Sequence, residues 1–341
     1  MKIESIKALS IKDIACQKNI YNELGKKELS EGKVGVIILS GGQGSRLGFD
    51  HAKGMYNIGE TKDVYLFELL INNLFKVVKE VNRFIPLFIM TSMENNDEIV
   101  AFFKEHNYFG YDSNYINFFT QGHLPALNLD GSVYHDKEGK EVLLPSGNGG
   151  WYKKLVESKL LAKYPEIEWL NVVGVDNPLQ IMADPTFIGA TIQNKHLIGA
   201  KVIEKAYKDE RVGVICRIDN KPSILEYFDA PEWVKDARDE NGDFIYKYGV
   251  ILNYLFSKKV LDENIDTPFK KYEVKKDVNV HGEIVPLLKT EMLILDMIEY
   301  FDSVCIYEVE REKEFAPIKN KEGIDSVISS KMLLKQNGVK L

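Results

Sequence analysis

The chain has 341 residues, 45% of them hydrophobic, which allows one large α/β core with a smaller lobe. Its formal net charge of −7 argues against nucleic acid as a partner, because proteins that bind nucleic acid usually present a basic surface. Three widely separated cysteines, and no apolar run that approaches the roughly 18 residues of a membrane span, indicate a cytoplasmic protein without a membrane partner.

The first half of the chain alternates between apolar runs and helical patterns. Residues 1–33 are expected to form one or two short helices. The pattern then predicts strands and helices in turn: strand 34–39, helix 65–82, strand 86–91, a helix around 99–103 and strand 116–120. Strands that alternate with helices predict an α/β fold with a doubly wound, mostly parallel sheet.

The second half is expected to complete this sheet and to add a small antiparallel lobe. The pattern predicts a hairpin at 133–144, a helix at 151–164, and strands at 169–175 and 304–309. Strands 199–204 and 213–218 are assigned to the antiparallel lobe. The expected division is an N-terminal helical segment at 1–33, a main domain at 34–320 and a residual C-terminal helix at 321–341.

The segment after the first strand carries the clearest chemical signal. Strand 34–39 runs into GGQGSRLG at 41–48, and Lys53 follows five residues later. Glycines allow backbone N–H groups to approach an anion, and Arg46 and Lys53 add two positive charges at the same loop. The combination predicts a polyphosphate site, and the alternative is an ordinary glycine-rich turn between a strand and a helix.

Two common phosphate-binding loops do not fit this segment. A P-loop needs Lys-Ser/Thr directly after its last glycine, and the dinucleotide fingerprint needs a glycine where Leu47 stands. The remaining form is the loop of enzymes that join a nucleoside triphosphate to a sugar 1-phosphate, L-x-x-G-x-G-T-x-M/L-G followed by P-K. Residues 39–48 fit this form, with Ser45 in place of threonine and Ala52 in place of proline.

Further polar segments are predicted at strand ends, where open α/β sheets bind their ligands. Gln121 suits the edge of a pyrimidine base, and its alternative is a plain turn residue. The segment PSGNGG at 145–150 opens a helix and could bind an oxygen-rich ligand or serve as a helix cap. Asp176 is an expected Mg²⁺ ligand, or alternatively caps the turn near Asp184. Lys319, taken alone, is expected to face solvent.

Together these segments resemble the eukaryotic-type UDP-N-acetylhexosamine pyrophosphorylases from about Val34 to Asn320. The matching motifs are GGQGSRLG with 53–56, then 90–92, 121–126, 145–150, 175–177, 183–185, 199–205, 212–217, 225–227, 307–309 and 315–320. The resemblance implies a Rossmann-like doubly wound mixed sheet of the nucleotide-diphospho-sugar transferase (GT-A-like) type. It also implies that UTP and N-acetylglucosamine 1-phosphate react, with Mg²⁺, to give UDP-N-acetylglucosamine and pyrophosphate.

The resemblance further implies a role for individual residues, carried over position by position. Those that would bind the nucleotide are Leu39, Gly41, Gly42, Gln121 and Gly147. Those that would contact the sugar are Asn148, Glu226 and Gly249. Those that would carry catalysis are Arg46 and Lys53 at the triphosphate and Lys319 at the phosphates of the product, and Asp176 would hold the metal.

The sequence departs from the family's pattern mainly on the sugar side. Residues that are unusual for the family stand at Ser146, Val250, Leu293 and Leu295. Val250 replaces an asparagine expected to hydrogen-bond the sugar, which would cost about 0.5–1.5 kcal/mol. Only residues 321–341 follow Asn320, so most of the family's C-terminal domain is expected to be missing. Two rival functions stay open: a UTP-dependent pyrophosphorylase for glucose, galactose or N-acetylgalactosamine 1-phosphate, and a nucleotide-sugar-binding protein without catalysis.

Overall fold

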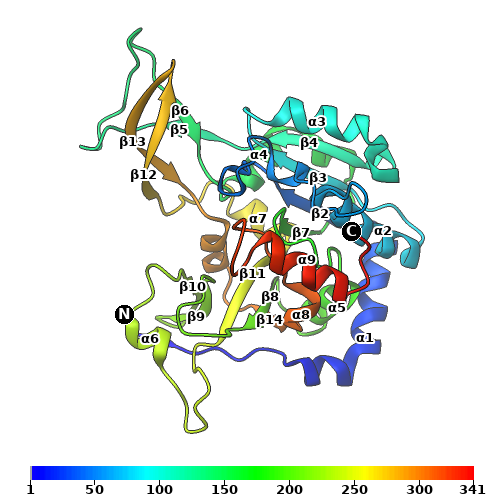
Figure 1. Ribbon diagram of the computed structural model, residues 1–341. Coiled ribbons are helices and arrows are strands. Elements are labelled where there is room, and N and C mark those ends of the chain that lie inside the picture. Colours follow the sequence, from blue (N-terminus) through cyan, green and yellow to red (C-terminus); the bar gives the residue numbers. More distant parts are fainter. Residues whose placement is uncertain (1) are drawn as a thin grey trace.

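A mixed sheet of ten strands forms the centre of the computed structural model, which describes residues 2–341 (Figure 1). Its main path runs β1 (Ile3–Glu4), β9 (Val214–Ile218), β11 (Tyr248–Ser257), β7 (Trp169–Gly174), β2 (Val34–Leu39), β3 (Leu87–Thr91) and β4 (Ile116–Thr120). Three strands lie off this path: β10 (Lys221–Leu225) on β9, and β8 (Ile198–Glu204) between β11 and β14 (Cys305–Glu308).

One half of the sheet is parallel. Strand β2 pairs in parallel with β3 and with β7, and β3 pairs in parallel with β4. Helix α2 (Leu66–Val81) connects β2 to β3, and helix α3 (Asn96–Glu105) lies between β3 and β4 in the chain. The prediction of a doubly wound α/β fold with a mixed sheet is therefore confirmed. The expectation of a mostly parallel sheet holds only for this half, because β11 pairs antiparallel with β7, β8 and β9.

Strand β2 is buried on both of its faces. Val36 and Ile38 belong to a core formed with α2, α3, α1 (Ile11–Ser30) and α5 (Pro185–Gln193). Ile37 and Leu39 belong to a second core, which includes α4 (Trp151–Glu157). This explains why the strand reads as a continuous apolar run, and it fixes the strand end from which the glycine loop begins.

The prediction that strands 199–204 and 213–218 belong to a separate antiparallel lobe is wrong. The segments expected at 199–204 and 213–218 form β8 and β9, which belong to the main sheet and not to a separate lobe. Strand β11 pairs antiparallel with both of them and with β7, and its register against β8 shifts between Val250 and Tyr254. A bulge of this kind bends a strand, which allows one long strand to serve several partners.

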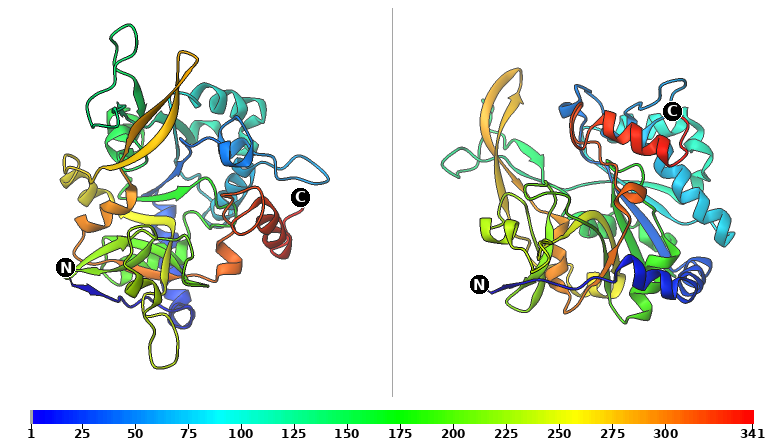
Figure 2. Two further views of the ribbon diagram at one scale, coloured as in Figure 1. Left: turned by 60° about the vertical axis from the view of Figure 1, so that its left-hand side comes forward. Right: turned by 60° about the horizontal axis from the view of Figure 1, so that its bottom comes forward.

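Two small antiparallel sheets form the arm of the molecule. Strand β5 (His123–Pro125) pairs with β6 (Leu143–Pro145), and β12 (Tyr272–Val280) pairs with β13 (Glu283–Glu291). The arm projects from one end of the molecule in Figures 1 and 2. The expected hairpin at 133–144 is only partly present, as an isolated bridge between His135 and Glu141.

Between β1 and β2 the chain forms one long helix, α1, in place of the one or two short helices expected, and its backbone touches that of α5. A Cβ atom placed on Gly25 would lie 1.8 Å from the carbonyl oxygen of Pro185, and one on Gly189 would lie 1.8 Å from that of Tyr21. No side chain larger than hydrogen fits at either position without a shift of the backbone.

The predicted helix at 151–164 is interrupted. Helix α4 ends at Glu157, and a separate 3₁₀ turn spans Leu160–Lys163, because Lys159 adopts a left-handed conformation with φ of 60°. The remaining helices are short except the last: α6 (Glu232–Asp236), α7 (Lys258–Glu263), α8 (Arg311–Glu314) and α9 (Val327–Gln336).

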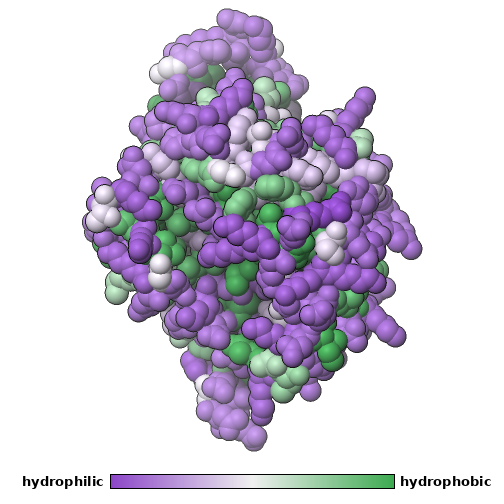
Figure 3. Space-filling view, turned by 90° about the vertical axis from the view of Figure 1, so that its right-hand side faces the viewer, coloured by the Kyte–Doolittle hydropathy of each residue, from purple (hydrophilic) through white to green (hydrophobic). Residues whose placement is uncertain are grey.

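Within residues 2–341, no helix combines the length and the apolar character needed to cross a membrane. The face shown in Figure 3 is mainly hydrophilic, and its hydrophobic side chains lie in small groups.

Candidate active site

The glycine loop begins at the carboxyl end of β2 and lies against Gln121, which follows β4. A Cβ atom on Gly41 would lie only 2.4 Å from Nε2 of Gln121, so the backbone of the loop and this amide are in contact. The backbone N–H of Gln121 donates to the carbonyl of Thr91 at the end of β3, at 2.8 Å. The expected meeting of these strand ends is therefore what the structure shows.

The loop closes on itself and brings Lys53 back to its start. The N–H of Gly44 donates to the carbonyl of His51 at 2.9 Å, and the N–H of Lys53 donates to the carbonyl of Gly42 at 3.3 Å. Arg46 lies in a 3₁₀ turn, Ser45–Leu47, and is exposed, and it forms no ion pair within the described residues 2–341. The loop thus presents one solvent-facing cation and one that is folded inward.

The inward cation meets Asp176. Strand β7 is the direct neighbour of β2, and the N–H of Val175 donates to the carbonyl of Leu39 at 3.3 Å. This places Nζ of Lys53 3.7 Å from Oδ2 of Asp176, with both side chains partly exposed. Asp176 is not a helix cap, because Asp184 caps α5 by accepting from the N–H of Thr186.

Asp176 offers a single carboxylate at this point, next to Lys53. No group of three or more histidine, cysteine, aspartate or glutamate side chains that could hold a metal occurs in the part of the chain from 2 to 341. Mg²⁺ suits such a site, because it is usually bound by one or two carboxylates together with water and substrate phosphates.

The loop at 145–150 joins the site through Gly122 and is held by the segment after β13. The N–H of Ser146 donates to the carbonyl of Gly122 at 2.9 Å. Gly147 has φ of 80°, and a Cβ atom there would lie 2.6 Å from the carbonyl oxygen of Met292. Its neighbour Asn148 does not cap α4, because its Oδ1 accepts from the N–H of Ile294 at 2.9 Å.

The expected sugar residues Glu226 and Gly249 lie around Gly213. A Cβ atom on Gly213 would lie 3.3 Å from Oε1 of Glu226 and 3.5 Å from Cγ2 of Val250. Gly249 lies in β11, where a Cβ atom would lie 2.6 Å from Cγ2 of Val212. Burial raises the pKa of Glu226, and the nearby positive charge of Lys319 acts in the opposite direction.

Lys319 is only partly exposed, whereas its isolated sequence context suggests a free, solvent-facing lysine. It follows a segment whose Ile318 N–H donates to the carbonyl of Asp176 at 2.9 Å. Its Nζ lies 3.1 Å from Oδ2 of Asp325 and donates to the carbonyl of Arg211 at 3.3 Å. The structure thus brings Lys319 to the end of β7, beside Glu226 and Asp176.

Three of the residues that depart from the family's pattern lie in or next to the loop at 145–150. Leu293 is half-buried and Leu295 is buried, both in the core that includes α4, on either side of the residue that donates to Asn148. The Oγ atom of Ser146 is buried and has no hydrogen-bond partner within residues 2–341.

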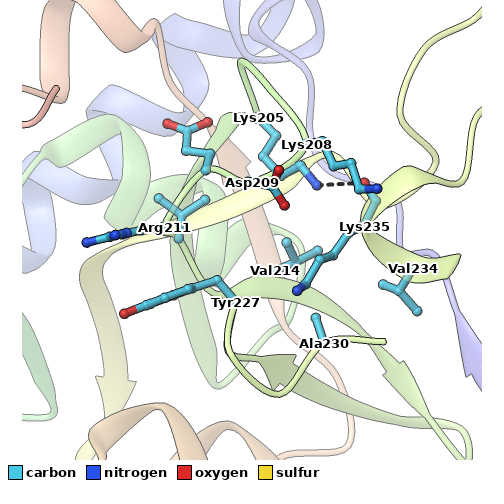
Figure 4. A pocket seen from close by; sticks show the side chains of 11 residues that line it. Lys205, Lys208, Asp209, Arg211, Val214, Tyr227, Ala230, Val234 and Lys235 are labelled. Atoms are coloured by element: carbon cyan, nitrogen blue, oxygen red, sulfur yellow. Dashed lines mark hydrogen bonds between the residues drawn. The ribbon is translucent and has the colours of Figure 1, made fainter. Parts of the chain in front are cut away.

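A pocket of about 210 Å³ lies next to the first residue of β9 (Figure 4). Its lining includes Val214, the first residue of β9, and Val212, whose Cγ2 would lie 2.6 Å from a Cβ atom on Gly249. Lys205 donates from Nζ to the carbonyl of Lys235 at 3.1 Å at this pocket, and Arg211 and Tyr227 also line it (Figure 4). The pocket therefore borders two of the expected sugar contacts: Gly249 through Val212, and Glu226 through Tyr227, the next residue in the chain.

Sequence reasoning missed a buried ion cluster behind the site. Lys201 in β8 forms ion pairs with Asp184 and Glu314. A lysine inside the otherwise apolar run IGAKVIE is the signal that could have identified it, because an isolated charge is rarely buried without partners.

The mixed sheet, with a glycine loop at the carboxyl end of its central strand, defines an α/β protein of the nucleotidyltransferase fold. The chain belongs to the UTP–glucose-1-phosphate uridylyltransferase family, whose model matches residues 1–341. The membership predicted from the motifs is therefore confirmed at the level of the family.

Individual relatives agree with this assignment. The chain is 34% identical over 324 residues to the human UDP-N-acetylhexosamine pyrophosphorylase-like protein 1, covering 89% of this chain and 64% of that protein. It is 34% identical over 331 residues to the UDP-N-acetylglucosamine pyrophosphorylase of Saccharomyces cerevisiae, covering 90% and 69%. The chain thus spans somewhat less than two thirds of the length of the human relative.

A solved structure is also similar over nearly the whole chain. The crystal structure of the putative UDP-N-acetylglucosamine pyrophosphorylase from Entamoeba histolytica superposes with a TM-score of 0.88 at 28% sequence identity. The match covers 98% of this chain and 88% of that one.

Proposed function

We propose that the protein transfers a uridylyl group from UTP to N-acetylglucosamine 1-phosphate, giving UDP-N-acetylglucosamine and pyrophosphate. The observation that carries this proposal is the meeting of the glycine loop, Gln121 and the Lys53–Asp176 pair at one edge of the sheet. The names of the relatives, which are pyrophosphorylases of UDP-N-acetylhexosamines, support the choice of substrates. The three unpaired cysteines fit a reducing compartment, so we place the reaction in the cytoplasm.

The uridine is proposed to lie where the glycine loop contacts Gln121. An amide side chain offers both a donor and an acceptor, which matches the edge of a pyrimidine. The absence of a side chain at Gly41 lets the backbone approach Gln121, and Gly42, which has open space around it, allows the backbone to approach the nucleotide closely. The backbones of Leu39 and Gly147 complete the set of proposed nucleotide contacts.

The proposed reaction is an in-line displacement at phosphorus. A phosphate oxygen of the sugar 1-phosphate attacks the α-phosphorus of UTP and forms the new P–O bond. The bond from the α-phosphorus to the bridging oxygen breaks, and pyrophosphate leaves with its electron pair. Catalysis then depends on positioning and on the neutralisation of negative charge, because the protein takes part in no covalent step.

The cations of the site suit these tasks. Lys53 and the exposed Arg46 can bind the β- and γ-phosphates and compensate the charge that develops on the leaving pyrophosphate. Lys319 can contact the phosphates of the product from the end of β7. Asp176 would hold Mg²⁺, which, when bound, adds positive charge next to the phosphates.

The sugar is proposed to contact Asn148, Glu226 and Gly249. Since Oδ1 of Asn148 already accepts from Ile294, its Nδ2 is the group that can donate to a sugar oxygen. Glu226 can accept from sugar hydroxyls, and Val250 presents methyl groups to the same region. This apolar contact removes one possible hydrogen bond, and we expect weaker discrimination among sugars than an asparagine would give.

The test is a panel of sugar 1-phosphates assayed with UTP and MgCl₂ by release of pyrophosphate. We expect the highest kcat/KM with N-acetylglucosamine 1-phosphate, followed by N-acetylgalactosamine 1-phosphate. Higher kcat/KM with glucose or galactose 1-phosphate would contradict the proposed substrate and leave uridylyl transfer intact. Tight binding of UTP without turnover on any member of the panel would contradict catalysis itself.

A further inference from the structure

A fully buried lysine lies behind the candidate site. Lys201 in β8 has an exposed fraction of 0%, and its Nζ lies 2.8 Å from Oδ2 of Asp184 and 2.6 Å from Oε2 of Glu314. The aromatic rings of Phe187 and Tyr307 face the ammonium group, with centroids at 5.5 and 5.8 Å. The ammonium is thus enclosed by two carboxylates and two rings.

The two carboxylates of this cluster have different tasks. Asp184 also caps α5, because its Oδ1 accepts from the N–H of Thr186 at 2.9 Å. Glu314 is the last residue of α8, and its carboxylate caps no helix. The contact between Lys201 and Glu314 therefore ties the end of α8 to the central sheet.

From Glu314 a chain of hydrogen bonds continues into the site. The carbonyl of Glu314 accepts from Nδ2 of Asn177 at 2.7 Å, and Oδ1 of Asn177 accepts from the N–H of Ala316 at 2.9 Å. The N–H of Ile318 donates to the carbonyl of Asp176 at 2.9 Å. The segment 314–318 is thus fixed to the turn at 176–177, and Lys319 follows directly.

We propose that Lys201 is a positioning residue, which acts through Glu314 to hold Lys319 and Asp176 in place. The kinetic consequence rests on the proposed uridylyl transfer, whereas the structural consequence does not. If the cluster only stabilised the fold, its loss would lower the unfolding temperature and leave the segment 315–319 and the turnover of the folded protein unchanged.

The experiment compares Glu314→Ala with Glu314→Gln. Both variants leave the buried Lys201 with one carboxylate, Asp184, so the charges balance and both are expected to fold. Glutamine keeps an oxygen that can accept from Lys201, whereas alanine removes it. The two variants therefore separate the anchoring hydrogen bond from the charge.

We expect Glu314→Ala to lower kcat about tenfold with KM for UTP within about twofold, because the loss concerns positioning and not nucleotide binding. Glu314→Gln should keep kcat within about threefold of the wild type. Hydrogen–deuterium exchange gives a readout that needs no activity: the amides of Ala316 and Ile318 should exchange faster in Glu314→Ala only. If the wild type lacks turnover, exchange still tests the positioning.

A second ion cluster at the other end of the sheet provides the matched control. Glu28 is also buried, lies 3.7 Å from Lys33, and shares that lysine with Glu31. Glu28→Ala should change the unfolding temperature without a change in kcat or in the exchange of 315–319. Equal kcat and equal exchange in the two Glu314 variants would overturn the proposal, and so would an equal effect of Glu28→Ala on that segment.

Discussion

The side-chain nitrogen of Lys53 lies 3.7 Å from Oδ2 of Asp176, and this pair links the glycine loop after β2 to the end of β7. Both side chains are partly exposed, so the pair itself contributes only about 0–1 kcal/mol to stability. Its importance is chemical: it places a cation and a carboxylate side by side at the edge of the sheet where the phosphates are proposed to bind.

Replacement of Lys53 by methionine should therefore affect turnover far more than folding. We expect kcat to fall about 100-fold, because one preorganised charge next to the leaving group is lost. The control is Lys62→Met, since Lys62 is an exposed lysine in the following segment and lies outside the proposed site. Unchanged kinetics in Lys53→Met would show that the triphosphate does not bind at this loop.

Gly41→Ala tests the close approach of the glycine loop to Gln121. The added methyl group would lie 2.4 Å from Nε2 of Gln121, so the amide must move. We expect the KM for UTP to rise about tenfold, because the base-binding amide is displaced. The unfolding temperature should also fall.

The double variant Gly41→Ala/Gln121→Ala separates the two effects of that change. Removal of the amide relieves the steric conflict, so the unfolding temperature should recover while the KM for UTP stays high. Recovery of UTP affinity in the double variant would contradict a role of Gln121 in binding the base.

Gly25→Ala tests the crossing of α1 and α5. Alanine is favoured over glycine in a helix by about 1 kcal/mol, but the new methyl group would lie 1.8 Å from the carbonyl oxygen of Pro185. Overpacking costs about 1–3 kcal/mol, and a clash with backbone belongs at the upper end of this range. After the gain in helix propensity we therefore expect a net destabilisation of about 2 kcal/mol in chemical denaturation. Lys18→Ala, at an exposed position of the same helix, should stay within about 0.5 kcal/mol of the wild type. An equal free energy of unfolding for Gly25→Ala and the wild type would contradict this prediction, because it would mean that α1 and α5 can move apart without loss of stability.

Glu226 gives a prediction for pH dependence. Burial raises its pKa above the ordinary value of 4.5, so the folded state holds the proton to higher pH than the unfolded state does. The contribution of this group to stability is therefore greatest below about pH 4.5 and is lost as the pH rises through the folded-state pKa. Glu226→Gln should unfold at a higher temperature than the wild type at about pH 7.5, with the difference vanishing near pH 4.

Glu60 provides the control of opposite sign. The hydrogen bond from Lys335 lowers the pKa of Glu60, so its contribution is present at neutral pH and is lost on acidification. Glu60→Gln should therefore never raise the unfolding temperature at neutral pH. A decrease for Glu226→Gln at the same pH would contradict the burial effect.

The parts of the site that are local in sequence could be predicted, and those that depend on distant contacts could not. Strand β2 and its glycine loop follow from six apolar residues and a run of glycines, which need no other part of the chain to be recognised. The position of Lys319 depends on a distant residue, Asn177, whose side chain forms hydrogen bonds with the backbone of Glu314 and Ala316. The membership of β8 and β9 in the main sheet depends on the register shift in β11, which leaves no periodic signal in the sequence.

The arm and the loop at 147–149 share one continuous stretch of backbone. Strand β13 ends at Glu291, and the next residue, Met292, accepts from the N–H of Gly149 at 2.8 Å and forms a bridge with Gly147. A tilt of the β12–β13 hairpin against the body of the protein would therefore also move the backbone at 147–149. This backbone borders both the proposed uridine site and the proposed sugar site.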